Sequence, residues 1–413
     1  MVSGGSVLLS WDYAPFIAFI AVMAILVFLD RKNIEAHGPL FIRRTNRGKG
    51  FLISAGKRLR RLWNPVGVIA VIVGFIASFF TIYSLADLLI KSAISMRPAA
   101  GVGLVLPSPV AVVAGGVIGV PLWHWLAAII LLLCVHEGLH GIMAVSQKMR
   151  IKSLGWIVLA VLPMGAFVEP DEKEVARKKP WPQLRFFAAG SFANIVLAFL
   201  VALVIAPLAI NPLVTTTTGL QVFPQAGYPF AKSQELIQMT GNFSQQLSPV
   251  IILKAVNGFK VENYDQAQKL FSELSIKSNQ TVTLSLDVYV GNELRSMDIR
   301  LDAVENPSNK TRGYNGILYD KRSPVVVKAE LLPWRGFIYF MTEMLQWIFI
   351  INLGVGMFNM LPLGPLDGKK MWDVALKRYM PRRYKAVMRV VQYLVLILLL
   401  AILVPSIASN FMG

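Results

Sequence analysis

The chain has 413 residues, of which 55% are hydrophobic and only 15% are charged, and its formal net charge is +18. Ordinary soluble domains contain roughly 45–50% apolar and about 25% charged residues, so this composition excludes an ordinary soluble globular protein. The positive charge lies mainly in three loops between apolar stretches, so we expect no nucleic-acid partner. The single cysteine, Cys134, excludes an intrachain disulfide.

Membrane-spanning helices are the first elements that the sequence predicts, because a crossing needs roughly 20 apolar residues. Suitable stretches lie near residues 12–29, 66–90, 123–146, 184–207, 335–358 and 386–406. The first lacks the basic start and the cleavage site of a signal peptide, so we expect it to be retained as a span.

Two further apolar stretches contain several prolines and glycines and are not predicted to cross the bilayer. For residues 98–122 we expect no transmembrane helix. For residues 151–170 we expect a short strand or hairpin that dips into the membrane, where irregular backbone must be covered by protein or line a water-filled cavity.

Basic residues alternate between the loops in the manner of the positive-inside rule. The clusters lie at residues 31–61, 148–179 and 369–385, whereas residues 211–330 are nearly balanced in charge. This pattern predicts that both termini and the balanced segment are extracytoplasmic and that the three clusters are cytoplasmic. Basic loops of this kind also suit anionic membrane lipids as partners.

The third predicted span contains His136, Glu137 and His140 in the pattern H-E-x-x-H. Positions i and i+4 of a helix share one face, so both imidazoles can bind one metal ion while Glu137 acts on a water beside it. The alternative is a pair of buried histidines that only hydrogen-bond to neighbouring helices. Ionisable residues inside a membrane favour the functional interpretation.

A third ligand is needed, because catalytic zinc sites usually have three protein ligands. The best candidate is Asp367 in the segment Asn359–Gly368, at the predicted cytoplasmic end of the fifth span. The histidine pair lies in the cytoplasmic half of its own span, so the predicted topology brings Asp367 and the imidazoles to similar depths. Prolines 362 and 365 end the helix and permit a turn there.

These segments resemble the site-2 protease family of intramembrane zinc metalloproteases over most of residues 123–405. The H-E-x-x-H helix is similar to the family's first motif, and Asn359–Gly368 is similar to its N-x-x-P-x-x-P-L-D-G motif, whose Asp is the third zinc ligand. Ala189–Asn194 resembles the family's A-G-P-x-x-N segment with Ser191 in place of Pro. Residues 163–170 resemble the membrane-associated hairpin of archaeal members. The resemblance implies a Zn²⁺ cofactor held by His136, His140 and Asp367, with Glu137 as general base.

Two asparagines, Asn194 and Asn359, have two open interpretations. Asparagines in membrane helices often hydrogen-bond to neighbouring helices. The resemblance adds the alternative that one or both orient the substrate backbone or stabilise an oxyanion, and Asn359 is favoured because it lies just before the helix break.

Residues 212–330 are predicted to form a soluble domain. The order is a strand at 250–256, a turn at 257–258, a helix at 265–274, and strands at 282–288 and 297–301. This order resembles a PDZ domain, which binds peptides by strand addition. Gly219–Val222 is only a partial match to the carboxylate-binding loop of such domains, and a gate or spacer is the alternative role.

We therefore expect a polytopic α-helical membrane protein of about six transmembrane helices with an inserted extracytoplasmic PDZ-like α+β domain. The expected parts are the N-terminal spans with their basic and Pro/Gly-rich loops, the two halves of a catalytic core and the inserted domain between the halves. The N-terminal part covers residues 1–122. The two halves of the catalytic core cover residues 123–211 and 331–413, and the inserted domain covers residues 212–330.

The predicted function is regulated intramembrane proteolysis, the zinc-dependent cleavage of transmembrane segments of protein partners. The alternatives are another membrane zincin, which uses Glu as its third ligand, and a non-enzymatic scaffold. The sequence leaves the substrate and the oligomeric state open.

Overall fold

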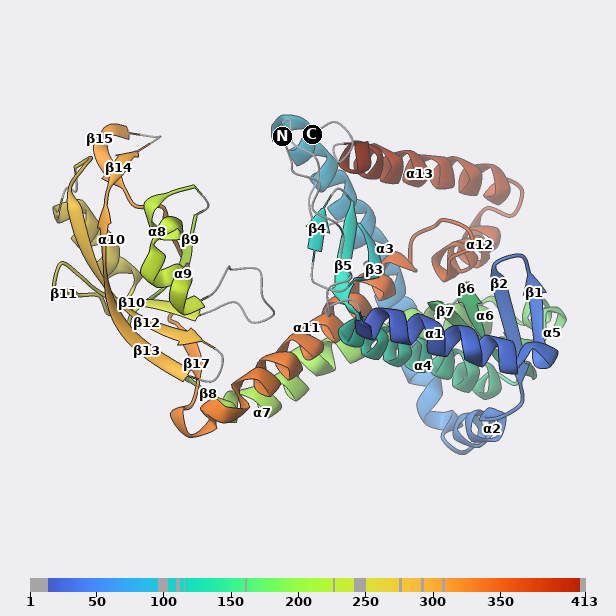
Figure 1. Ribbon diagram of the computed structural model, residues 1–413. Helices are drawn as coiled ribbons and strands as arrows, with labels where there is room; N and C mark the ends of the chain where they lie inside the picture. The colour runs from blue at the N-terminus through green and yellow to red at the C-terminus, as the bar shows by residue number, and fades with distance from the viewer. Residues whose placement is uncertain are drawn as a thin grey trace. The chain divides into compact units, whose positions relative to one another are not determined.

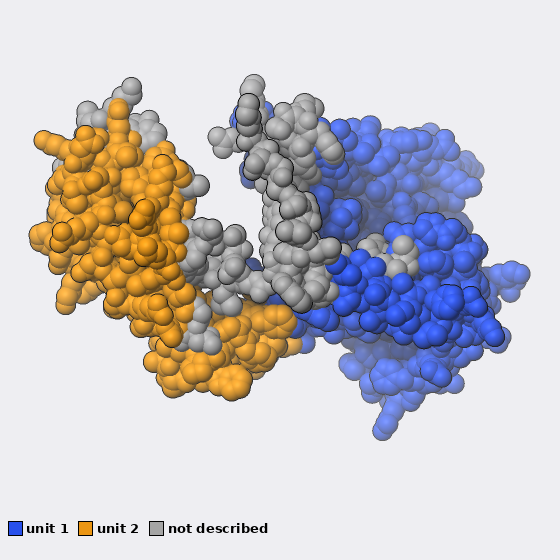
Figure 2. Space-filling view, in the orientation of Figure 1, with its two compact units in different colours: residues 1–204, 344–413 blue, residues 205–343 orange. Residues whose placement is uncertain are grey.

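The computed structural model describes residues 14–95, 103–108, 112–114, 116–159, 162–225, 227–240, 250–274, 277–290, 293–306 and 309–408. Two units are distinguished by their internal contacts (Figure 2): residues 1–204 with 344–413, and residues 205–343. The first is mainly helical and the second is mainly built from β-sheet.

Five helical segments in the described part of the chain are long and apolar enough to cross a membrane (Figure 1). They are α3 (Arg60–Ser95), α4 (Leu122–Ser146), α6 (Pro180–Leu200) with its continuation through a π-helical turn (Val201–Ile205) into α7 (Ala206–Ile210), α11 (Arg335–Phe358) and α13 (Tyr384–Ala408). The first expected span is shorter, because α1 (Ala14–Leu29) has 16 residues. Residues 12–13 of that expected span lie outside the described residues. The polytopic helical class is therefore confirmed, and a sixth span stays a prediction.

The stretches that we did not expect to cross contain strands. Residues 104–121 hold β3 (Leu104–Ser108), β4 (Val112–Ala114) and β5 (Val117–Pro121). The hairpin expected at residues 151–170 is present as β6 (Ile151–Leu159) and β7 (Leu162–Pro170). Together with β1 (Ile34–His37) and β2 (Leu40–Thr45), the hairpin forms a four-stranded antiparallel sheet in the order β1-β2-β6-β7. Its depth in the membrane stays a prediction.

Small residues on one face of α3 let other helices approach closely. The buried positions include Gly67, Ala70, Gly74 and Ala77, spaced three or four residues apart. A Cβ atom at Gly67 would lie 2.9 Å from the Arg185 side chain of α6, so a larger residue would require that side chain to move. Close approach over small residues is the usual way in which helices associate within a membrane.

Three shorter helices accompany the spans in the helical unit. They are α2 (Lys49–Arg58), α5 (Glu172–Arg177) and α12 (Asp367–Tyr379). Leu52 of α2 joins a buried cluster with Ala144 of α4 and Val168 of β7. Trp372 of α12 donates a hydrogen bond to Ser78 of α3 at 2.9 Å. These contacts attach α2 to the span α4 and α12 to the span α3.

The second unit contains a sheet in the order β13-β12-β10-β9-β16. Its strands are β9 (Leu220–Pro224), β10 (Val250–Val256), β12 (Thr281–Val290), β13 (Glu293–Asp302) and β16 (Ile317–Tyr319), and β11 (Phe259–Lys260) pairs with β10. The shorter elements are α8 (Pro229–Lys232), α9 (Gln234–Thr240), α10 (Tyr264–Glu273), β8 (Val214–Thr216), β14 (Val304–Asn306), β15 (Asn309–Tyr314) and β17 (Val325–Val327). The predicted order of strand, turn, helix and two strands is therefore present.

The core of this unit follows from alternation along its strands. Val282, Leu284, Leu286 and Val288 of β12 all point to the same face and are buried. At the start of α10, the Asn263 side chain accepts the backbone N–H of Gln266 at 2.9 Å, a typical N-cap.

Candidate metal centre

Three residues that are far apart in the sequence converge in the helical unit. The Nε2 atoms of His136 and His140 lie 3.2 Å apart. The Oδ2 atom of Asp367 lies 3.3 Å from the first of these nitrogens and 3.0 Å from the second. Ligand atoms held 2.0–2.1 Å from a tetrahedral zinc ion would be about 3.3 Å apart. The spacing and the nitrogen and oxygen donors therefore fit zinc.

Asp367 is positioned by the turn between α11 and α12. The Gly368 N–H donates to the carbonyl oxygen of Asn359 at 2.8 Å, which ties the start of α12 to the end of α11. A Cβ atom at Gly368 would lie 2.2 Å from the backbone of Met360, so this packing requires glycine. Asp367 begins α12, where a carboxylate is also favoured by the helix dipole.

The ring of His140 is oriented by a backbone carbonyl. Its Nδ1 lies 2.8 Å from the carbonyl oxygen of Phe186 in α6. A carbonyl only accepts, so Nδ1 carries the proton and Nε2 presents its lone pair towards Asp367 and His136. This is the tautomer that a metal ligand needs.

The ring of His136 has a side-chain partner, Asn194. The Asn194 amide nitrogen lies 3.0 Å from His136 Nδ1, and the amide oxygen is buried without a hydrogen-bond partner among the described residues. Turning the amide by 180° places the oxygen against Nδ1, so that Nδ1–H donates and Nε2 is free for a metal. This orientation of the amide is the one that a metal-binding Nε2 of His136 requires.

Glu137 lies beside the imidazole pair and lines a cavity of about 520 Å³ together with His140 and Asp367. One carboxylate oxygen, Oε2, accepts the backbone N–H of Val168 in β7 at 2.8 Å. The hydrogen bond orients the carboxylate while leaving its second oxygen for a proton. The cavity gives this group room for a water molecule and a peptide carbonyl.

The electrostatics of Asp367 keep it ionised. Burial raises the pKa of the carboxyl group, but the His140 and His136 imidazoles, when they also carry a proton on Nε2, and the Lys370 ammonium lower it well below its usual range. Lys370 Nζ donates to Asp367 Oδ1 at 3.3 Å, which leaves Oδ2 to face the imidazoles. An ionised carboxylate is the form that binds metal.

The structure places Gly190 of α6 against the two imidazoles, a contact that the sequence did not predict. A Cβ atom there would lie 2.4 Å from His140 Nε2 and 2.6 Å from His136 Nε2. Any larger residue would therefore fill the space between the imidazoles. The signal was available in Ala189–Asn194, where a glycine interrupts a helix, although nothing in that pattern says what the glycine faces.

The chain's other two histidines, His124 and His37, are not among the three ligands. His124 opens α4, His37 lies in β1, and neither belongs to the metal-binding group found among the described residues. The backbone carbonyl of Asn359 supports the Asp367 turn. Its partly buried side chain makes no hydrogen bond with the described residues.

The fold has membrane-spanning helices, and its site brings the two histidines of the H-E-x-x-H pattern close to the carboxylate of Asp367. These features together define a membrane metallopeptidase. The sequence model of Peptidase family M50, the site-2 protease family, matches residues 124–306 and 323–402. The match covers more than half of the chain, and the chain belongs to this family of intramembrane metalloproteases. It is also similar to the uncharacterized protein MJ0971 of Methanocaldococcus jannaschii, at 24% identity over 91% of this chain and 90% of the relative. The protein is therefore a membrane-integral peptide hydrolase.

Proposed function

We propose that the protein is a zinc endopeptidase that cleaves transmembrane segments of other membrane proteins in regulated intramembrane proteolysis. His136, His140 and Asp367 would hold the ion. The observation that carries the proposal is the convergence of these three ligand atoms at zinc-like spacing beside Glu137. Zinc, when bound, would act as a Lewis acid that lowers the pKa of a water molecule and polarises the scissile carbonyl.

The chain's own residues perform the proton transfers and the positioning. Glu137 takes a proton from the attacking water and returns it to the leaving amine. The Val168 N–H holds this carboxylate, while the Phe186 carbonyl and the Asn194 amide hold the two imidazoles. Asn194 is thus a positioning residue. Asn359 is the remaining candidate for orienting the substrate backbone or stabilising an oxyanion.

A transmembrane substrate must unwind before it is cut, because a helix locks its carbonyls in hydrogen bonds to the residue four positions later. We therefore propose that helix-weakening residues near the scissile bond favour cleavage. The basic clusters support a topology in which the metal centre lies in the cytoplasmic half of the bilayer and both termini lie outside.

The first experiment compares detergent-purified wild type with Glu137→Gln for zinc content and for cleavage of a generic transmembrane substrate. We expect one zinc per chain in both proteins and cleavage by the wild type alone. Absence of zinc from both would overturn the proposed site. Asp367→Ala serves as the matched ligand variant: loss of its zinc supports the aspartate ligand, and full retention would favour a zincin with a glutamate ligand.

We further propose that residues 205–343 contain a PDZ-like peptide-binding domain. Gly219–Val222 is an unsuitable binding edge, because β9 pairs with β10 on one side and with β16 on the other. The strand β16 lies at the end of the sheet order, and the Tyr319 ring lies 5.5 Å from that of Tyr264 in α10. Gly313–Gly316 precede this strand, and Gly316 has φ of +76°. These features support a peptide adding to β16 beside α10.

Peptide titration tests this domain assignment in the full chain. We expect a fluorescent peptide with an apolar C-terminal residue to bind wild type and to bind Tyr319→Ala more weakly. The same peptide with an amidated C-terminus is the control, and it should lose affinity if the carboxylate is recognised. Equal binding of both peptides would show that the carboxylate is not recognised, whereas no binding, or binding that Tyr319→Ala leaves unchanged, would favour the gate or spacer role.

A further inference from the structure

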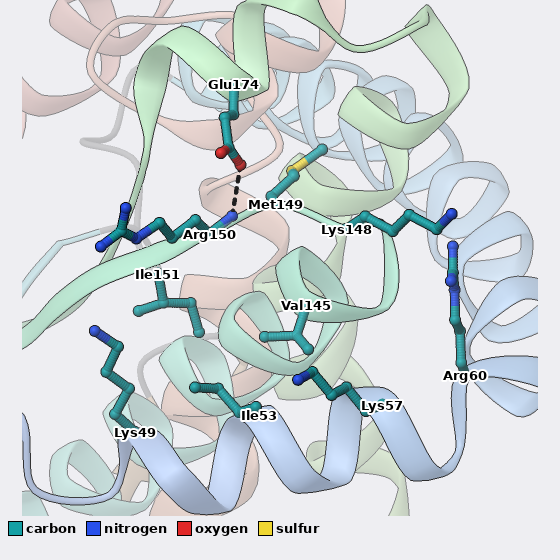
Figure 3. A pocket seen from close by; sticks show the side chains of 10 residues that line it. All are labelled: Lys49, Ile53, Lys57, Arg60, Val145, Lys148, Met149, Arg150, Ile151 and Glu174. Atoms are coloured by element: carbon teal, nitrogen blue, oxygen red, sulfur yellow. Dashed lines mark hydrogen bonds between the residues drawn. The ribbon is translucent and has the colours of Figure 1, made fainter.

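A second cavity, of about 650 Å³, lies where α2 meets the end of α4 and the start of β6 (Figure 3). Cationic side chains from three segments line it: Lys49, Lys57, Arg60, Lys148 and Arg150. Apolar side chains lie between them: Ile53, Val145, Met149 and Ile151. The cavity is separate from the metal centre and shares none of its lining residues.

The positive charge of this basic cavity is not neutralised within the described part of the chain, where its five cationic side chains form no ion pair. The one carboxylate among its lining residues, Glu174, already accepts the backbone N–H of Arg150 at 2.8 Å (Figure 3). Like charges gathered around one hollow repel each other and create a strongly positive potential. An anion bound there would relieve this repulsion.

Lys148 holds its cationic side chain at a backbone position that usually favours glycine. Its backbone is left-handed, with φ of +57°, directly after the end of α4. The Met149 N–H donates to the Ala144 carbonyl at 2.8 Å and the Lys148 N–H donates to the Val145 carbonyl at 3.0 Å, which closes the helix end. Glycine is the usual residue at such a helix end because a side chain is strained there. A lysine in this position keeps a cation at the cavity against the local backbone preference.

The location points to a lipid. The span α3 begins at Arg60 and the span α4 ends at Ser146, so the basic cavity lies at the ends of two membrane helices. Basic pockets at this level bind the headgroups of anionic lipids. Five cations beside the one carboxylate, Glu174, leave an excess of four positive charges, more than one singly charged phosphodiester would neutralise. We propose that the cavity binds the headgroup of a membrane lipid that carries at least two negative charges on phosphate, with the apolar side chains contacting its glycerol and acyl portions.

The basic cavity is linked to the metal centre by packing. Met149 and Ile151 of the cavity belong to the same buried cluster as Val168 and Phe186. These last two residues supply the backbone groups that hold Glu137 and His140. An occupied cavity should therefore stabilise the catalytic geometry and raise the cleavage rate. This consequence rests on the proposed proteolytic function, whereas lipid binding does not.

Lipid retention by the detergent-purified full chain tests the site. Native mass spectrometry would be run with cardiolipin, which carries two phosphates, and with zwitterionic phosphatidylcholine. We expect Lys57→Gln combined with Arg150→Gln to weaken cardiolipin retention about tenfold or more. The matched control, Arg382→Gln combined with Lys385→Gln, removes two exposed cations near the start of α13 and should bind as wild type does. Lys148→Gly should weaken binding without lowering thermal stability, because glycine suits the left-handed backbone.

Equal loss of cardiolipin in the pocket and control variants would overturn the site in favour of general surface charge. If millimolar sodium phosphate displaces the bound cardiolipin as well as added cardiolipin does, the lipid assignment is overturned in favour of a small soluble anion. In liposomes, the pocket variants should lose the stimulation of cleavage by cardiolipin while keeping their zinc. If wild type binds the lipid but cleaves no substrate, the proteolytic proposal fails and the lipid site stands.

Discussion

Gly190 provides a direct residue-scale test of the metal centre, because it leaves the space in which the two imidazoles approach each other. We expect Gly190→Ala to lower zinc affinity roughly 10- to 100-fold, the usual range for changes beside metal ligands. The control is Gly138→Ala in α4, where an added Cβ meets nothing within 4 Å. Both variants remove a helical glycine, so they share the gain in helix propensity. Zinc content after dialysis should fall for Gly190→Ala alone.

Asn194 provides a second test, of hydrogen bonding to a ligand. We expect Asn194→Leu to weaken zinc binding about 10- to 100-fold, because His136 Nδ1–H loses its acceptor and the ring its orientation. Asn194→Asp keeps an acceptor at the same place and should bind zinc at least as well as the wild type. Competition with a chelator of known affinity measures both. A leucine variant with wild-type affinity would show that the amide does not support the ligand.

At the scale of elements, the docking of α2 onto α4 depends on a close contact at Gly56. A Cβ atom at Gly56 would lie 2.7 Å from the Val145 side chain and 2.8 Å from the Ile142 carbonyl oxygen. We expect Gly56→Ala to destabilise the protein by about 1–3 kcal/mol, as overpacking does. The control Gly50→Ala lies in the same helix with nothing within 4 Å. It should be neutral or stabilise by up to about 1 kcal/mol.

Thermal unfolding in detergent measures this difference. Gly56→Ala should unfold at a lower temperature than wild type and Gly50→Ala should not. If the two variants unfold alike, α2 is not held against α4 through this glycine. The lipid headgroup proposal would then lose the packed wall on which its cavity depends.

Topology belongs to the scale of the whole molecule. The positive-inside rule predicts that the loop containing Arg47 is cytoplasmic and that the segment containing Lys277 is outside. In a Cys134→Ala background, a cysteine at position 277 should react with a membrane-impermeant maleimide on intact cells. A cysteine at position 47 should react only after the cells are permeabilised. Labelling of both positions on intact cells would contradict the predicted orientation.

The spans and the histidine pair were predictable because local rules set them. The expected span at 335–358 coincides with α11, and the expected span at 123–146 differs from α4 by one residue at its start. Bilayer thickness sets these lengths. The spacing of His136 and His140 follows from 3.6 residues per turn, whatever the rest of the chain does.

Sequence by itself thus determined the polytopic class and the histidine pair, because these depend on apolar length and helical periodicity. It indicated Asp367 through the need for a third ligand and through the motif at Asn359–Gly368. Tertiary structure decided which groups support those ligands. The Phe186 carbonyl and the Val168 N–H are backbone atoms, which every residue carries and no pattern distinguishes. The position of Gly190, the place of β16 at the edge of the described sheet and the basic cavity all arise from segments far apart in the chain. So does the contact between His140 and Asp367 across 227 residues. Such placements are set by packing between elements, which periodicity along the chain does not encode.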